Sequence, residues 1–267
     1  MLQTTAHLKG FAIKATDGSL GTVDDIYFDD ETWTVRYLTV KTGGWLSGRQ
    51  VLISPISVKY ADWQGRQLNV SLTMKQVEES PDINKHQPVS RQHEAVYNSY
   101  YGYPYYWGGP YLWGSAFYPE GLAVPAHSYE DAQAGKIGVE SGDTHLRSTE
   151  AVTGYDIDAL DGEIGHVAGF VIDDKAWAIR YIEVATKNWL PSKKVLMSPN
   201  WVERVSWEDF RVYTELTRDA IKAAPPYMEQ MAITRDYENE LFVHYGKPPY
   251  WLNETRHKYA PLVLGVT

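Results

Sequence analysis

Two pairs of adjacent aspartates, Asp29-Asp30 and Asp173-Asp174, are the strongest candidates for acid–base or cation chemistry. Neighbouring carboxylates could share a proton or bind a cation. Each pair, however, separates two stretches rich in β-branched and aromatic residues, and an Asp at such a place commonly caps its own turn. We therefore expect turns here and not active sites.

Two arginines, Arg36 and Arg180, follow the aspartate pairs in segments where the alternate residues are apolar. An arginine on that face would point into a core, where a charged group needs a partner. An Asp is the most suitable partner, so the same residues are expected to stabilise the fold.

Other sources of chemistry are few. The sequence contains no phosphate-binding loop, no dinucleotide-binding glycine motif, no HExxH and no GxSxG. It has no cysteine, which excludes disulfides, thiol catalysis and cysteine-based zinc sites and indicates a reducing compartment. The eight histidines are scattered. We expect no catalytic residue, no metal and no cofactor.

The net charge of −9 disfavours direct binding of nucleic acid, whose phosphates would be repelled. No apolar run reaches the roughly 18–20 residues of a membrane helix, and the first residues lack the pattern of a signal peptide. The expected location is the cytoplasm, without direct insertion into a membrane.

The elements that must position these residues form an internal repeat. Gly10-Phe11 corresponds to Gly154-Tyr155, at an offset of 154 − 10 = 144. The same offset relates, without a gap, Asp17-Gly18 to Asp161-Gly162, Asp29-Asp30 to Asp173-Asp174, Trp33 to Trp177, Arg36-Tyr37 to Arg180-Tyr181, Trp45-Leu46 to Trp189-Leu190, Ser54-Pro55 to Ser198-Pro199, Trp63 to Trp207, and Tyr106-Trp107 to Tyr250-Trp251. The division that follows is a first module with an aromatic tail at 1–108, a Gly-, Pro- and acid-rich linker at 109–150, a second module at 151–254 and a C-terminal tail at 255–267.

Each module is predicted to be mainly β. A change in the parity of the apolar residues predicts a β-bulge near Asp24-Asp25. Thr73 and Thr217 are suitable N-caps for a short helix. The module ends in a short helical aromatic tail, which we expect to be ordered and packed on a barrel.

The run G-x-x-I-x-A-x-D-G-x-x-G-x-V, followed by D-D, W-x-[VI]-R-Y, W-L and V-L-[IM]-S-P, occurs in both modules. This pattern resembles the PRC-barrel family, named for the cytoplasmic domain of the H subunit of the photosynthetic reaction centre. The resemblance implies two small, highly bent β-barrels in tandem, which bind other macromolecules and carry no catalytic residue.

Two Trp-Leu pairs, Trp45-Leu46 and Trp189-Leu190, fall in the loops after the long third strand of each module. An exposed Trp-Leu pair needs a cover, either the chain itself or a partner, so these four residues are the candidate interaction site.

We consider three functions. The leading one is a non-catalytic scaffold or assembly protein with an unidentified protein partner, and oligomers are possible. The second is an accessory subunit of a membrane complex, like the reaction-centre H subunit. The third, a hydrolase, is disfavoured because no catalytic constellation is present.

Overall fold

The computed structural model describes residues 1–46, 49–81, 89–120, 122, 145–186 and 194–252. We call residues 1–120 the first half and residues 145–252 the second half. The elements of the first half are β1 (Leu2–Thr4), α1 (Thr5–Leu8), β2 (Ala12–Lys14), β3 (Ser19–Asp29), β4 (Thr34–Lys41), η1 (Gly43–Leu46), β5 (Gln50–Ile53), η2 (Pro55–Ser57), β6 (Val58–Asp62), β7 (Gln67–Val70), α2 (Met74–Glu78), α3 (Arg91–Tyr101) and η3 (Tyr106–Gly108). Those of the second half are β8 (Leu146–Ser148), α4 (Thr149–Val152), β9 (Asp156–Ala159), β10 (Gly162–Asp173), β11 (Ala178–Thr186), β12 (Lys194–Met197), η5 (Pro199–Trp201), β13 (Val202–Ser206), β14 (Arg211–Thr214), α5 (Arg218–Ala223) and α6 (Arg235–Tyr245).

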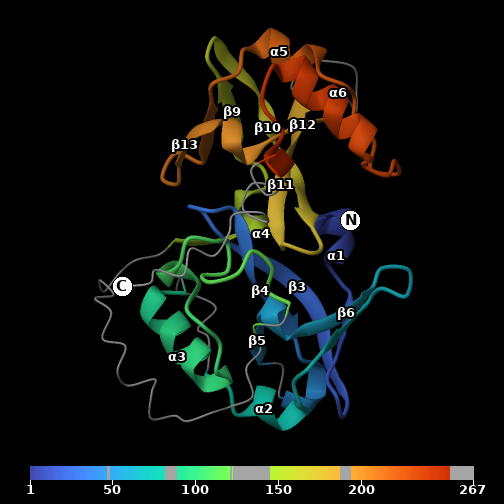
Figure 1. Ribbon diagram of the computed structural model, residues 1–267, viewed down its shortest axis with the longest axis vertical. Coiled ribbons are helices and arrows are strands. Elements are labelled where there is room, and N and C mark those ends of the chain that lie inside the picture. Colours follow the sequence, from blue (N-terminus) through green and yellow to red (C-terminus); the bar gives the residue numbers. More distant parts are fainter. Residues whose placement is uncertain (47–48, 82–88, 121, 123–144, 187–193, 253–267) are drawn as a thin grey trace, which may run out of the picture.

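The order of elements repeats at the offset seen in the sequence. The helix α3 and its counterpart α6 begin at Arg91 and Arg235, and 235 − 91 = 144. The strands β5 and β12 begin at Gln50 and Lys194, again 144 apart. In Figure 1 the two halves lie end to end along the long axis, the first half below, with α3 and α6 on opposite sides.

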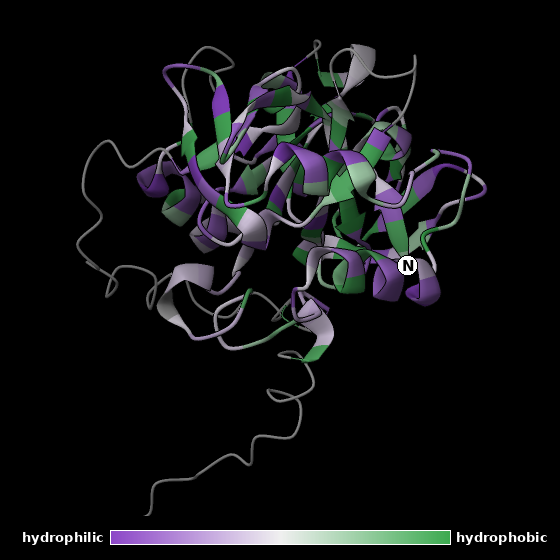
Figure 2. Cartoon of the chain, turned by 90° about the horizontal axis from the view of Figure 1, so that it is seen from above, coloured by the Kyte–Doolittle hydropathy of each residue, from purple (hydrophilic) through white to green (hydrophobic). Residues whose placement is uncertain are grey.

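All described strands belong to one mixed sheet of fourteen strands, in the order β13-β14-β9-β10-β11-β4-β3-β2-β7-β6, with β1, β12, β5 and β8 attached beside this path. The pairs β2–β7 and β9–β14 are parallel, and the other pairs are antiparallel. The sheet does not close. The mainly β class is therefore confirmed. The predicted division into two separate barrels is not confirmed, because the described strands form one open sheet. Hydrophobic residues concentrate on the strands in the middle of the molecule (Figure 2).

The opening strand of each half pairs with the other half, which the sequence did not indicate. Strand β1 lies beside β10, and β8 lies beside β3, in equivalent registers: Leu2 is opposite Asp173, and Leu146 is opposite Asp29. Because each half contributes its first strand to the other, backbone hydrogen bonds of these strands join the two halves.

A second contact between the halves lies where β4 meets β11. Val35 N donates to Trp177 O and Ile179 N donates to Trp33 O, both at 2.7 Å. Both tryptophans have positive φ, 52° and 55°. This conformation is unusual for a bulky residue, and it persists only where the surrounding structure imposes it.

Local expectations agree with the structure at several points. The pairing of β3 with β4 shifts register between Val23 and Asp25, which is the predicted bulge. Thr73 caps α2 with a complete capping box. The hairpin between β9 and β10 turns at Leu160-Asp161, because Gly162 pairs with Ala159.

The aromatic tails pack as predicted for their helices. Tyr97 on α3 is buried, its hydroxyl donates to Leu52 O and it accepts from Ser54 N, both at 3.1 Å. On α6, Leu241 and Tyr245 are buried in the equivalent place. Each helix ends at a left-handed glycine, as a C-terminal cap requires.

Candidate functional site

Arg36 lies in the middle of β4 with its side chain only 1% exposed. Its Nη1 donates to Leu112 O at 2.6 Å, and its Nη2 donates to Thr32 Oγ1 at 3.0 Å and lies 3.6 Å from Asp29 Oδ2. The guanidinium also stacks on the Tyr106 ring, 3.5 Å from its centroid. Burial lowers the pKa of Arg36, and the Tyr106 and Asp29 groups oppose that effect. The predicted Arg–Asp pair is therefore present, and it is structural.

The Asp29-Asp30 pair makes a turn, as the sequence indicated. Asp29 Oδ1 accepts from the backbone N–H groups of Glu31 and Thr32 at 3.0 and 2.9 Å. Asp30 Oδ2 accepts from Arg147 Nε at 2.8 Å, across the exchanged strand β8. Both carboxylates are engaged by donors, which favours their structural role.

Glu94 on α3 is fully buried and holds the tail against the sheet. Tyr106 Oη donates to Glu94 Oε1 at 2.7 Å, and His145 Nε2 lies 2.9 Å from Glu94 Oε2. Burial and the charge of Glu94 raise the pKa of Tyr106 well above its usual value. Burial opposes the charged form of His145, but the hydrogen bond and charge of Glu94 outweigh it and raise the pKa of His145. Tyr106 belongs to the tail and His145 to the start of the second half, so Glu94 links these two segments.

The second half has an equivalent arrangement around Glu238 and Arg180. Tyr181 and Tyr250 both donate to Glu238 Oε1 at 2.8 Å, Arg180 Nη2 donates to Asp173 Oδ2 at 3.0 Å, and the Arg180 guanidinium lies over the Tyr250 ring at 4.2 Å from its centroid. The first half adds a cover over its arginine, made by Leu112 and Trp113, which the sequence placed in the linker. Trp113 is 1% exposed.

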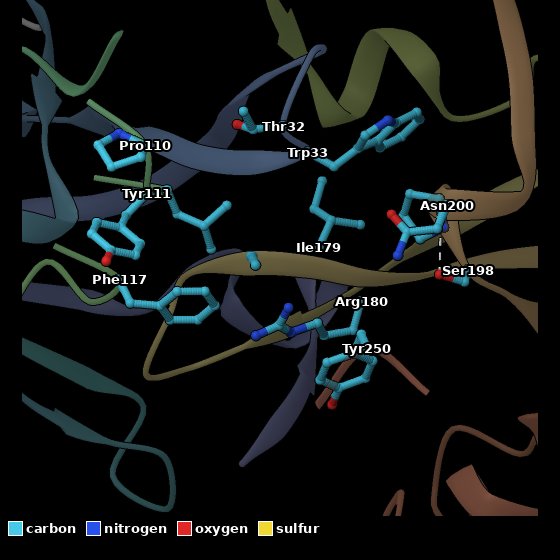
Figure 3. Close-up of a pocket in the computed structure, with 13 residues that line it drawn as sticks. Thr32, Trp33, Pro110, Tyr111, Phe117, Ile179, Arg180, Ser198, Asn200 and Tyr250 are labelled. Atoms are coloured by element: carbon cyan, nitrogen blue, oxygen red, sulfur yellow. Dashed lines mark hydrogen bonds between the residues drawn. The ribbon is translucent and has the colours of Figure 1, made fainter. Parts of the chain in front are cut away.

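Arg180 lines a cavity of about 270 Å³. Its walls come from both halves: the turn of Thr32 and Trp33, the segment 110–117, β11 and the start of η5. Figure 3 shows the Arg180 side chain reaching along one wall, with Tyr250 beneath it and Phe117 opposite. The cavity volume is near the lower end of ligand sites in proteins, roughly 300 Å³. We call this cavity the Arg180 pocket.

The Arg180 pocket combines apolar walls with a few polar groups, the usual composition of a binding site. Apolar surface is provided by Trp33, Leu112, Phe117, Ile179 and Pro199, whereas Arg180, Asn200 and Tyr250 provide polar atoms. A guanidinium in such a setting can donate to a carbonyl or carboxylate oxygen.

The Trp-Leu pairs predicted as the interaction site lie elsewhere. Trp45 and Leu46 form the end of η1 and are half-buried against the core. Trp45 Nε1 donates to Leu20 O at 2.9 Å. This indole is thus covered by its own half, and a role in partner binding stays a prediction. Trp189 and Leu190 lie outside the described residues.

Sequence reasoning missed the Arg180 pocket because it combines segments far apart in the chain. One signal was available: the tail motif Tyr106-Trp107 recurs in both copies, but Trp113 corresponds to His257. A residue that differs between copies is not required by the shared fold, and Trp113 is one of the residues that cover Arg36.

Within the described ranges, no group of three or more His, Asp or Glu residues is placed to hold a metal ion. In the same part of the chain, no helix has the length and apolar character needed to cross a membrane.

A family model matches part of the chain. No curated protein matches the chain. Residues 7–68 match the PRC-barrel domain family, a segment that runs from α1 into β7. It contains Arg36, Asp29 and the Trp45-Leu46 pair. The similarity to the PRC-barrel domain family therefore lies within the first half of the chain.

Proposed function

We propose that the protein is a non-catalytic interaction or assembly module that presents two PRC-type halves in tandem to a protein partner. The match of residues 7–68 to the PRC-barrel domain carries this proposal. The recurrence of the elements at an offset of 144 supports the extension to the second half, for example in the equivalent pairing of β1 and β8.

The chemistry of the buried charges supports a role without catalysis. Glu94 interacts with Tyr106 and His145, and Arg36 interacts with Asp29 and Leu112 O. These groups are occupied with one another in the interior, so they stabilise the fold. The proposed location is the cytoplasm, since a protein without cysteine needs no disulfide and suits a reducing compartment.

The experiment is an affinity purification of the full-length chain from the cells that encode it, followed by mass spectrometry. We expect a polypeptide recovered in near-stoichiometric amount that an unrelated acidic bait does not retain. Recovery of photosynthetic reaction-centre or light-harvesting polypeptides would favour the accessory-subunit alternative. If nothing is retained above the control bait, the proposal is wrong.

A further inference from the structure

In the first half, Arg36 is covered by a short segment of the same chain, which shows how this fold holds a peptide segment. The segment 110–113 places the Leu112 carbonyl 2.6 Å from Arg36 Nη1 and inserts the Trp113 indole between the two halves. Trp113 Nε1 donates to Ala176 O at 2.9 Å, on the turn of the opposite half, and its ring lies 5.0 Å from the Arg36 guanidinium. A carbonyl oxygen and an indole N–H thus satisfy one donor and one acceptor at the junction.

The Arg180 pocket lies at the corresponding place of the repeat. An offset of 144 relates Arg36 to Arg180, Tyr106 to Tyr250, and Thr32 to Ala176, and the pocket is lined by Thr32, Arg180 and Tyr250. The pocket therefore offers the second copy of the surface that Leu112 and Trp113 cover in the first half. The side chain of Arg180 is only 9% exposed, so a group that reaches it is largely removed from water.

The chain's own sequence does not repeat the covering residues. At the positions 144 residues after Leu112 and Trp113 stand Arg256 and His257, outside the described residues. An arginine is a poor neighbour for the Arg180 guanidinium because like charges repel. The sequence of the repeat thus keeps Arg180 and Tyr250 but does not keep the Leu-Trp pair of the covering segment.

We infer that the Arg180 pocket binds a short peptide segment of a partner protein, with a backbone carbonyl oxygen on Arg180 and an aromatic side chain, best an indole, against Thr32 and Ile179. The inference rests on the proposed function, since it names the partner chemistry of an interaction module. The aromatic side chain contacts the apolar lining at Ile179 and Phe117, and its N–H points to the turn at Thr32, as that of Trp113 points to Ala176.

The test uses the full-length protein, isotopically labelled, and a synthetic peptide GPYLWGSA, which has the sequence of residues 109–116. We expect saturable changes of the backbone amide signals of Thr32, Ile179 and Asn200 on titration to millimolar peptide. A peptide with alanine in place of tryptophan is expected to bind at least tenfold more weakly. Absence of changes at these amides, or equal binding of both peptides, would overturn the inference.

Two substitutions locate the binding. Arg180→Lys keeps the positive charge but loses the planar donor pair, and at least a tenfold loss of affinity is expected. Arg180 also pairs with Asp173, so its replacement could disturb the fold. A second variant, Asn200→Trp, blocks the opening of the Arg180 pocket from an exposed position, and Asn200→Ala is its matched control. Asn200→Trp should remove binding without lowering the melting temperature, and Asn200→Ala should retain it.

The same variant separates this inference from the proposed function. If a partner is co-purified equally by the wild type and by Asn200→Trp, that partner binds elsewhere. The interaction function then stands and the peptide pocket is rejected. If no partner is co-purified but the peptide titration behaves as expected, the pocket stands and the scaffold role is rejected.

Discussion

Replacement of Trp113 by alanine is the sharpest test of how the two halves are held together. The indole is 1% exposed, and it lies where the segment after the first aromatic tail meets the second half. If this segment were a linker, its loss would be nearly neutral. If it is a structural wedge, the change removes a large buried side chain at the junction of the halves.

The expected cost follows from burial and hydrogen bonding. Truncation of a buried Trp to Ala typically costs about 3–5 kcal/mol. Trp113→Ala also leaves Ala176 O without the indole donor, and an unsatisfied buried acceptor costs about 1–3 kcal/mol. The stacking with Arg36 is lost as well. We therefore expect a loss near the upper part of the first range. At roughly 2–4 °C per kcal/mol for a chain of this size, a loss of about 4–5 kcal/mol should lower the melting temperature by roughly 8–20 °C.

The assay is thermal and urea unfolding followed by circular dichroism. Trp113→Phe keeps most of the volume and loses mainly the hydrogen bond, so it should cost about 1–3 kcal/mol. Tyr118→Ala is the control within the same segment, because Tyr118 is 42% exposed and its loss should cost about 0.5 kcal/mol or less. The structural role would be refuted if Trp113→Ala unfolded within 2 °C, roughly the shift for 1 kcal/mol or less, of the wild type, or if it matched Tyr118→Ala.

Three further outcomes are expected. Gly21→Ala should destabilise the protein by about 1–3 kcal/mol more than Gly43→Ala in urea titrations. A Cβ at position 21 would lie 1.9 Å from the Lys41 carbonyl oxygen, whereas a Cβ at position 43 would meet open space. Equal stabilities of the two variants would contradict the tight approach of β3 to β4. Since the pKa of His145 is raised in the folded state, its stabilisation is complete below the unfolded pKa of about 6.5 and is lost as the pH rises through the higher folded value. The melting temperature of the wild type should therefore exceed that of His145→Asn by more at about pH 6 than at about pH 9, and a constant difference would exclude this linkage. Trp45→Ala should lower the melting temperature, because the half-buried indole also donates to a backbone carbonyl; an unchanged melting temperature together with loss of a co-purified partner would instead identify Trp45 as a binding residue.

Much of the local structure could be predicted from the residues alone. The repeat at an offset of 144, the bulge near Asp25, the cap at Thr73 and the pairing of Arg36 with Asp29 all depend on nearby residue types or on burial of a charge. Such features follow from backbone sterics, alternation of apolar residues and the cost of an unpaired buried charge. Because the pattern occurs twice, each of these features could also be compared between two stretches of the sequence.

The pairing between the halves was decided only by the tertiary structure. Strands β1 and β8 have three residues each, and nothing in so short a strand specifies which of two equivalent long strands it pairs with. The registers of β3 and β10 are equivalent, so the choice depends on chain geometry and on contacts such as Arg147–Asp30. The Arg180 pocket follows from the same juxtaposition, because its walls come from the turn at Thr32, the segment with Phe117 and the start of η5. A sequence specifies which side chains need burial or a partner, but the partner is fixed by the approach of distant segments. Here that approach joined the two halves of the chain into a single sheet.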